Sequence, residues 1–310
     1  MTILITGGAG YVGTQLIYQL IQEPGVSRII LYDNLSRDSY NVFLGHSLNE
    51  RAKNKDLRIE LVHGELLNTR KLRKYVSESD IIYHLAAKVL TPFSTTDGHA
   101  YEQTNHWGTA ELVYAIEEAP GIQKLIYLSS TSVYGSAHVS EDTPPDPRTI
   151  YGISKYRGEE HVRRLFSKIP TYIIRCGNVY GYNKSLRFDA VINRFMFEAN
   201  FKRRISIHGD GKQRRSFISV QKVGEVLTQL LSADVPSDTY NLVEKNLQVL
   251  DIVDVVKAIY FDLEFIFVNR HLSLRELSVD TELKLFNYLP RWEESSLLDE
   301  MEEFRNRFSF

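Results

Sequence analysis

The first half of the chain alternates short, continuously apolar segments with longer amphipathic ones. The apolar segments predict strands at Ile3–Thr6, Arg28–Tyr32, Arg58–Val62, Ile81–His84, Leu125–Ser129 and Tyr172–Arg175. The amphipathic segments predict helices near Val12–Gln22, Thr69–Ser77, Tyr101–Glu118 and Tyr151–Ser167. Strands without polar alternation are typical of a parallel sheet that helices cover on both faces. The pattern therefore predicts an α/β fold with a doubly wound parallel (Rossmann) sheet.

The pattern changes after about residue 176. A turn rich in glycine, asparagine and tyrosine (177–183) leads to a predicted helix, Phe188–Phe201, and to a short strand beginning at Ile205. A helix near Gln221–Ser232 and a strand near Tyr240–Val243 are expected to return to the main sheet. We predict a nucleotide-binding domain of residues 1–176 plus about 217–243. Residues 177–216 and 244–310 are then a smaller C-terminal α/β lobe that holds the substrate.

Composition excludes several classes of protein. The 310 residues are 43% hydrophobic and 25% charged, with a net charge of −2, which gives no reason to expect nucleic acid or an anionic membrane as a partner. No apolar run is long enough to span a bilayer, and no basic leader precedes the first strand. The single cysteine, Cys176, is expected to be buried, and the nine histidines lack metal-site spacing. We expect a cytoplasmic protein without a metal.

A glycine-rich turn follows the first predicted strand. Gly7, Gly10 and Gly13 have a spacing that lets the backbone approach a pyrophosphate at the start of a helix. Asp33 lies twenty residues beyond Gly13, where a carboxylate can accept hydrogen bonds from the adenosine ribose. That carboxylate favours NAD over NADP, although Arg37 leaves NADP open. A turn-capping role is the alternative for Asp33.

Two further polar residues lie near the expected cofactor site. His84 precedes Leu85-Ala86-Ala87, whose small size would let a cofactor lie against the tip of the strand. We interpret His84 itself as a structural core histidine. Asn105 lies inside a predicted long helix, where its amide could hydrogen-bond backbone and hold a kink.

Ser130, Tyr151 and Lys155 form the candidate catalytic group. Tyr151 and Lys155 stand four residues apart on one face of a helix. An ammonium beside a phenol favours the phenolate, so we expect Lys155 to lower the pKa of Tyr151. In this hypothesis Tyr151 takes a proton from a substrate hydroxyl while hydride leaves the same carbon for a nicotinamide. Ser130 hydrogen-bonds the reacting oxygen.

These motifs together resemble the extended short-chain dehydrogenase/reductase family, in its nucleotide-sugar epimerase and dehydratase branch. The matching segments are Thr6–Gly13, Asp33–Ser36, Gly64–Leu66, His84–Ala87, Asn105–Thr109, Ser129–Gly135, Tyr151–Lys155, Arg175–Gly181 and Gly209–Val220. The resemblance implies tightly held NAD. The predicted NAD contacts are Gly7, Gly10, Tyr11, Val12, Gly13, Asp33, Asn34, Glu65, Leu66, Leu85, Ala86, Ala87, Asn105 and Lys155.

The resemblance also implies a UDP-, dTDP- or GDP-linked sugar as substrate. Ser130 and Tyr151 would contact the sugar, Asn178 the phosphates, and Arg215 and Arg270 the diphosphate. A homodimer is implied, in which the predicted helices Tyr101–Glu118 and Tyr151–Ser167 of two copies form a four-helix bundle. The chain departs from the family pattern at Glu65, at Tyr182, and at Gln221-Lys222, where acidic residues are frequent.

Residues after Ser130 separate the reactions of this family. Dehydratases that act at C4 and C6 carry an Asp-Glu pair where this chain has Thr131 and Ser132. Decarboxylating relatives carry a glutamate at the second of these places, and epimerase-reductases need a histidine where Asn183 stands. The segment most resembles 4-epimerases, which oxidise C4 and return hydride to the opposite face. The open alternatives are a 4-ketoreductase or dehydratase-like enzyme of a deoxysugar pathway, and a non-catalytic dinucleotide-binding protein.

The sequence does not identify the nucleotide or the sugar. Their selection depends on the space left by Thr91–Thr96, Val133–Ser136, Tyr182 and the C-terminal lobe.

Overall fold

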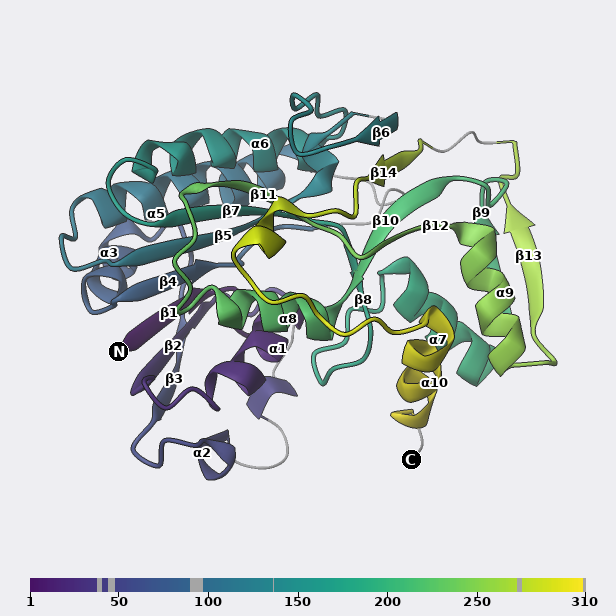
Figure 1. Cartoon of the computed structure of the whole chain (residues 1–310), viewed down its shortest axis with the longest axis horizontal. Coiled ribbons are helices and arrows are strands. Elements are labelled where there is room, and N and C mark those ends of the chain that lie inside the picture. The colour runs from purple at the N-terminus through teal and green to yellow at the C-terminus, as the bar shows by residue number, and fades with distance from the viewer. Residues whose placement is uncertain (38–40, 44–47, 90–96, 136, 272–274, 309–310) are drawn as a thin grey trace.

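A seven-stranded parallel sheet forms the centre of the N-terminal part (Figure 1). The computed structural model describes residues 1–37, 41–43, 48–89, 97–135, 137–271 and 275–308. The strand order is β11 (Asp238–Leu242), β7 (Thr171–Cys176), β5 (Lys124–Ser130), β4 (Ile81–His84), β1 (Thr2–Thr6), β2 (Arg28–Asp33) and β3 (Arg58–His63). This confirms the predicted doubly wound sheet and the return of the strand near residue 240. The order reverses between β1 and β4, so a crevice forms at their carboxyl ends.

Helices cover both faces of this sheet (Figure 1). One face carries α1 (Tyr11–Leu20) and α8 (Val220–Gln229), and the other carries α3 (Thr69–Ser77), α5 (Gly108–Glu117) and α6 (Ile150–Val162). Successive strand residues point to opposite faces, so Ile3 and Ile5 enter one core cluster and Leu4 enters the other. Because both clusters exclude water, the strands are apolar throughout.

The predicted helix Tyr101–Glu118 is present from residue 98 to residue 117, with an irregularity at the expected Asn105. It consists of α4 (Gly98–Tyr101), a π-helical segment η2 (Glu102–Trp107) and α5. The wider turns surround Asn105, whose amide exchanges hydrogen bonds with the backbone of Lys88 at 2.7 and 3.0 Å. The predicted role of Asn105 in holding an irregular helix is thereby confirmed. The other short turns are η1 (Asn41–Phe43), α2 (Leu48–Arg51), η3 (Thr131–Val133), η4 (Arg163–Leu165) and η5 (Lys284–Asn287).

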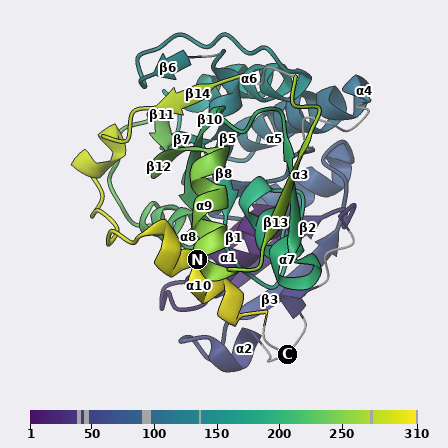
Figure 2. The same cartoon turned by 90° about the vertical axis from the view of Figure 1, so that its right-hand side faces the viewer.

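The C-terminal part has small sheets and a core of its own (Figure 2). The sheets are β12 (Lys245–Gln248), β10 (Arg214–Ser219) and β8 (Asn178–Tyr180), then β13 (Glu264–Val268) with β9 (Arg204–His208), and β14 (Leu277–Val279) with β6 (Ala137–Val139). Helices α7 (Val191–Lys202), α9 (Val249–Ile259) and α10 (Leu297–Asn306) enclose residues such as Phe195 and Phe217. The predicted division at residue 176 stays a prediction, which this separate core supports.

A buried ion pair joins α6 to three strands of the main sheet. The Arg175 guanidinium on β7 donates to both carboxylate oxygens of Glu159 on α6, at 3.0 and 2.7 Å. Ser129 on β5 donates to the same carboxylate at 2.6 Å. A third guanidinium nitrogen donates to the hydroxyl of Tyr134, which donates to Asn241 on β11. Glu159 is 0% and Arg175 3% exposed, so a lost partner would leave a charge in a dry interior.

Replacing Arg175 with methionine should therefore lower the free energy of unfolding by about 3–5 kcal/mol, measured by urea denaturation. Arg163 retains a contact of 2.9 Å with Glu159, which places the expected loss toward the lower end of this range. The matched control is Arg164→Met. Arg164 is 47% exposed, and its partner Glu117 keeps Lys168 at 2.6 Å, so the expected loss is below about 1 kcal/mol. Similar losses in the two variants would contradict this view of the buried pair.

Candidate active site

The glycine turn between β1 and α1 is closed so tightly that larger residues do not fit. Gly7 has φ +74°, and a Cβ there would lie 2.6 Å from the backbone nitrogen of Ala86. A Cβ on Gly13 would lie 2.5 Å from the Gly7 carbonyl oxygen. The helix begins after Gly10, and no side chain caps its first amides. These amides are free to bind an anion, as the pyrophosphate of a dinucleotide requires.

Asp33, at the end of β2, faces this turn. One carboxylate oxygen accepts from the Ala9 amide at 3.0 Å, and the other from the Leu35 amide at 2.8 Å. Burial raises the pKa of Asp33, and these two amide hydrogen bonds oppose that rise. The carboxylate thus caps its own turn and also lies against the glycine turn. Each oxygen keeps a lone pair, so the predicted contact with a ribose remains compatible with this arrangement.

The remaining predicted cofactor residues surround the tips of β1, β3 and β4. His84 is confirmed as a core histidine: its ring is fully buried and bonded to Thr6 and Thr109 at 2.6 and 2.9 Å. Burial and the nearby Lys155 lower the pKa of His84 to about 3. Glu65 accepts from the side chain of Asn34 at 3.1 Å. The cofactor contacts expected of Asn34, Glu65, Leu66, Leu85, Ala86, Ala87 and Asn105 stay predictions.

The structure brings Ser130 and Tyr151 together. Ser130 ends β5, and Tyr151 lies in the first turn of α6, whose start is capped by a hydrogen bond of 3.0 Å from the Gly152 amide to Thr149 Oγ1. A Cβ on Gly152 would lie 2.2 Å from the Ser132 carbonyl oxygen, so glycine lets α6 approach the segment that follows Ser130. The side chain of Ser130 lies close enough to the Tyr151 hydroxyl to act on its pKa.

Lys155 is buried one turn along α6. Its ammonium donates to the Leu128 carbonyl oxygen at 2.8 Å and lies 4.2 Å from the centroid of the Tyr127 ring. Burial lowers the pKa of Lys155 to about 7, while the charge of Glu159 acts to raise it. The lysine can therefore gain or lose a proton near neutral pH.

The prediction that Lys155 lowers the pKa of Tyr151 was wrong when only the groups of the protein itself are considered. Burial raises the pKa of Tyr151 above its ordinary value, and this effect outweighs the neighbouring Ser130 side chain and the charge of Arg187, which act to lower it. The physical reason is that the Lys155 ammonium is directed to Leu128 and the Tyr127 ring. A low pKa for Tyr151 needs a further positive charge in the site.

Arg187 is a charged neighbour of Tyr151 that the sequence pattern does not single out. It forms a two-pronged ion pair with Asp189 at 2.9 and 3.0 Å, in the loop before α7. Arg37, near the cofactor turn, reaches the same carboxylate at 3.8 Å and donates to the Val89 carbonyl oxygen at 2.8 Å. Neither local spacing nor hydropathy marks this cluster, because its members come from loops 150 residues apart in the chain.

The loop after β8 is held against the start of α1. Asn183 is buried and donates to the Tyr11 carbonyl oxygen at 2.7 Å, and the Tyr11 hydroxyl donates to the Gly181 carbonyl oxygen. Tyr182 packs on Phe304, with ring centroids 5.9 Å apart. The loop therefore joins the cofactor helix to the C-terminal part. Of the segments expected to select the sugar, residues 91–96 and 136 lie outside the described residues.

The predicted substrate residues fall into two groups. Asn178 starts β8 and donates to the Ser216 carbonyl oxygen at 3.0 Å, and Arg215 lies next to Ser216 on β10. Arg270 is exposed and lies 5.1 Å from the Phe267 ring. Burial and the charge of Arg275 lower the pKa of Arg215. Arg275, which the sequence does not single out, is thus the arginine that acts on Arg215.

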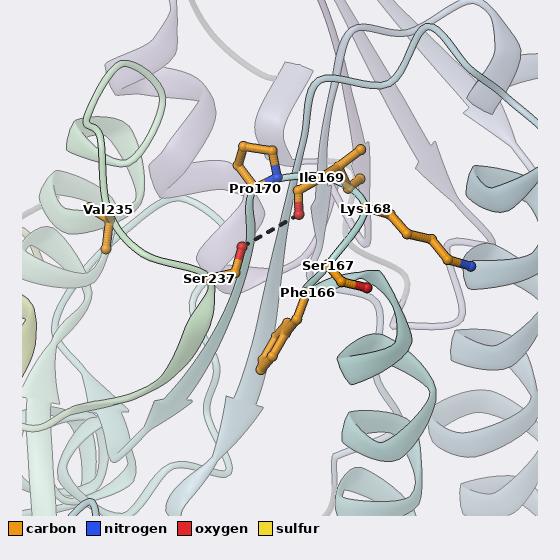
Figure 3. A pocket seen from close by; sticks show the side chains of 7 residues that line it. All are labelled: Phe166, Ser167, Lys168, Ile169, Pro170, Val235 and Ser237. Atoms are coloured by element: carbon orange, nitrogen blue, oxygen red, sulfur yellow. Dashed lines mark hydrogen bonds between the residues drawn. The ribbon is translucent and has the colours of Figure 1, made fainter.

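The hollow shown in Figure 3 is not part of this site. It lies at the amino end of β7, whereas Ser130 and Tyr151 lie at the carboxyl end of the sheet. Its lining is Phe166, Ser167, Lys168, Ile169, Pro170, Val235 and Ser237. Among the described residues, no cluster of three His, Cys, Asp or Glu side chains is suited to a metal. In the same residues, no helix is both long and apolar enough to cross a membrane.

Comparison with known proteins identifies the family. Residues 3–242 match the sequence model of the NAD dependent epimerase/dehydratase family. The chain is 31% identical over 247 residues to a dTDP-D-glucose 4,6-dehydratase of Mus musculus, covering 77% of this chain and 67% of that protein. It is 27% identical over 275 residues to a dTDP-L-rhamnose 4-epimerase of Burkholderia thailandensis, with 75% and 73% covered.

A solved structure extends the likeness to the whole chain. The UDP-glucuronic acid 4-epimerase of Bacillus cereus, in complex with UDP-glucuronic acid and NAD, has a TM-score of 0.86 and 26% identity. The match covers 99% of this chain and 98% of that one. The doubly wound sheet, the closed glycine turn and the Ser–Tyr–Lys group define a dinucleotide-dependent enzyme. The chain belongs to the NAD-dependent epimerase/dehydratase family, and its cofactor is NAD.

The burial of Lys155 should be visible in the pH dependence of stability. Its pKa is about 7 in the folded chain against an ordinary 10.5, so the unfolded chain binds one more proton across that interval. Stability therefore rises with pH there, by about 1.4 kcal/mol per pH unit from this group. Lys155→Met removes the effect. Between about pH 7.5 and 9.5, urea unfolding should show the wild type gaining roughly 2.7 kcal/mol relative to the variant. Parallel pH profiles would refute the assignment.

Proposed function

We propose that this enzyme is an NAD-dependent nucleotide-sugar 4-epimerase. The observation that carries the proposal is the neighbouring Ser130 and Tyr151 on the helix of buried Lys155. Two neutral residues, Thr131 and Ser132, follow Ser130 in the chain. Tyr151 takes the proton from the C4 hydroxyl and later returns it, and Ser130 holds the same oxygen. When bound, NAD supplies the hydride acceptor and a positive charge beside the phenol. A positive charge beside the phenol would offset the effect of burial, which raises the pKa of Tyr151.

Epimerisation needs no acid and base beyond Tyr151. The sugar is oxidised at C4, turns over, and receives the hydride on its other face, so the cofactor is regenerated in each cycle. Thr131 is buried, and the Ser132 amide donates to Ser130 Oγ at 3.1 Å. A hydroxyl at these places cannot act as the carboxylic acid and base of an elimination near neutral pH. Both residues therefore favour epimerisation.

The second candidate is a 4,6-dehydratase, the activity after which the mouse relative is named. Its elimination requires a carboxylic acid near C5 and C6. Two carboxylates that act on the catalytic group or on its neighbour Arg187 are committed elsewhere: Glu159 pairs with Arg175, and Asp189 pairs with Arg187. This commitment is our reason for ranking the dehydratase second. A 4-ketoreductase would use the same three catalytic residues, and the product assay below separates it from an epimerase.

We further propose that Asn178, Arg215 and Arg275 hold the diphosphate of the substrate. Asn178 and Arg215 lie on neighbouring strands of one small sheet, with Phe217 opposite Asn178 in the register. Arg275 acts electrostatically on Arg215, whereas Arg270 lies by Phe267. A guanidinium whose pKa is lowered by a neighbouring guanidinium favours a bound anion between the two groups. We therefore prefer Arg275 to the predicted Arg270 as the second diphosphate arginine.

We also propose a cytoplasmic homodimer formed through α5 and α6. The two helices pack side by side on one face of the sheet (Figure 1). Trp107, just before α5, and Ile150, the first residue of α6, are 47% and 45% exposed and offer apolar surface for such a contact. Sedimentation at micromolar concentration should therefore give about twice the mass of 35.8 kDa. A monomer under these conditions would exclude this assembly.

To test the proposed reaction, the protein is incubated with UDP-glucose, UDP-galactose, their N-acetyl and uronate forms, and dTDP-sugars. The products are identified by NMR. At least one should give its C4 epimer without net consumption of NAD. Tyr151→Phe should lower the rate by about 10²–10⁴-fold, because it removes the proton acceptor and keeps the ring. Tyr156→Phe, one turn further along α6, is the matched control and should retain the rate.

Other products decide against the proposal. A 4-keto-6-deoxy product would establish a dehydratase, and stoichiometric use of NADH with such a ketone would establish a reductase. No turnover of any sugar, with unchanged ligand binding by Tyr151→Phe, would favour a non-catalytic binding protein.

A further inference from the structure

Four largely buried, charged side chains form a network between α8, β12 and α10. We call them the lysine–glutamate network: Lys222, Glu244, Lys245 and Glu300. The Lys222 ammonium lies 2.7 Å from Glu244 and 3.0 Å from Glu300, and the Lys245 ammonium lies 2.7 and 3.4 Å from the same two carboxylates. The four side chains are only 6–18% exposed. Such an arrangement is stable only when every charge is paired.

Each of the three strands of the small sheet has one of its two ends at this network. Tyr180, at the end of β8, donates its hydroxyl hydrogen to Glu300. The amide of Ser219, at the end of β10, donates to Glu244 Oε2 at 3.2 Å. Lys245 is the first residue of β12, and Glu244 directly precedes it. A single group of charges therefore sets the position of three strand ends.

The same network ties the sheet to the NAD-binding part. Lys222 lies in α8, whose neighbouring residues Val223 and Val226 belong to the core cluster under α1. Ser295, just before α10, also accepts from the Lys222 ammonium at 2.7 Å. Lys222 is thus the member that joins the C-terminal helix and the small sheet to the helix covering the main sheet.

Electrostatics keep the network charged. Burial acts to lower the pKa of Lys222, but the hydrogen bonds and charges of Glu244 and Glu300 outweigh it, so the pKa is raised. For Glu300, burial acts to raise the pKa, and hydrogen bonds from Ser295 and Tyr180 with the charges of both lysines lower it overall. Because the charges persist at neutral pH, displacement of one strand end would separate buried ions. The network therefore favours one arrangement of the sheet.

We infer that Lys222 is a positioning residue: through the lysine–glutamate network it fixes the strands that carry Asn178 and Arg215 relative to the NAD-binding part. This inference rests on the proposed function, which assigns those two residues to the diphosphate. Arg215 lies four residues before Ser219, roughly 13 Å along the strand. The inference also explains why lysine stands where the family often has an acidic residue, since Glu244 and Glu300 supply the opposite charges.

The test compares Lys222→Met with Lys124→Met in the full-length protein with NAD. Lys124 is also buried, but it donates to carbonyl oxygens of Leu230, Leu231 and Ala233 at the far end of the sheet. Hydrogen exchange of residues 178–180 and 214–219 should become about tenfold faster in Lys222→Met, with 2–6 and 28–33 unchanged. Lys222→Arg should restore the slow exchange. Glu300→Gln, which keeps hydrogen bonds with Tyr180 and Ser295, is the milder second variant and should give a smaller change in the same strands.

A kinetic measurement separates positioning from general stability. In Lys222→Met the KM of the converted nucleotide sugar, and the Kd of UDP and dTDP, should rise about tenfold while kcat stays within about twofold. Unchanged exchange in residues 178–180 and 214–219, or the same uniform change in the Lys124→Met control, would overturn the inference. If the wild type converts no nucleotide sugar, the proposed function fails, and the exchange result still decides whether the network positions these strands.

Discussion

The pairing of Glu159 with Arg175 is the interaction on which the reactive end of the sheet depends. It connects α6, which carries Tyr151 and Lys155, to β7 and, through Ser129, to the strand that ends at Ser130. A carboxylate buried at this depth needs charged partners on fixed elements, and the arginine supplies two parallel hydrogen bonds. The geometry between the serine, the tyrosine and the lysine follows from this connection, because their backbones cannot move independently.

Burial also determines how these groups bind protons. The same dry interior lowers the pKa of Lys155 and raises that of Tyr151, since each shift disfavours the charged form. The protein thus disfavours the charged form of both groups, while the charge of Glu159 acts against this for Lys155 and that of Arg187 for Tyr151. A site of this kind responds strongly to any further charge that binds in it.

A second set of buried charges orders the small sheet to which we assign the diphosphate of the substrate. Glu159 and Arg175 fix the chemistry to the main sheet, whereas Lys222 and its partners fix the small sheet to α8. The two sets lie on different elements and share no residue. The position of the small sheet is therefore set separately from that of the strands and the helix that carry Ser130, Tyr151 and Lys155.

The sequence by itself determined the sheet, the glycine turn and the Ser130–Tyr151–Lys155 group, because apolar strands and short motifs are local signals. It located Asp33 and the buried His84 for the same reason. The π-helical interruption at Asn105, the direction of the Tyr151 pKa shift and the cluster of Arg37, Arg187 and Asp189 were decided only by tertiary structure. The role of Lys222 was also decided by tertiary structure, because its partners lie 22 and 78 residues away in the sequence. Burial and long-range pairing depend on how the elements pack, and no local pattern records that packing.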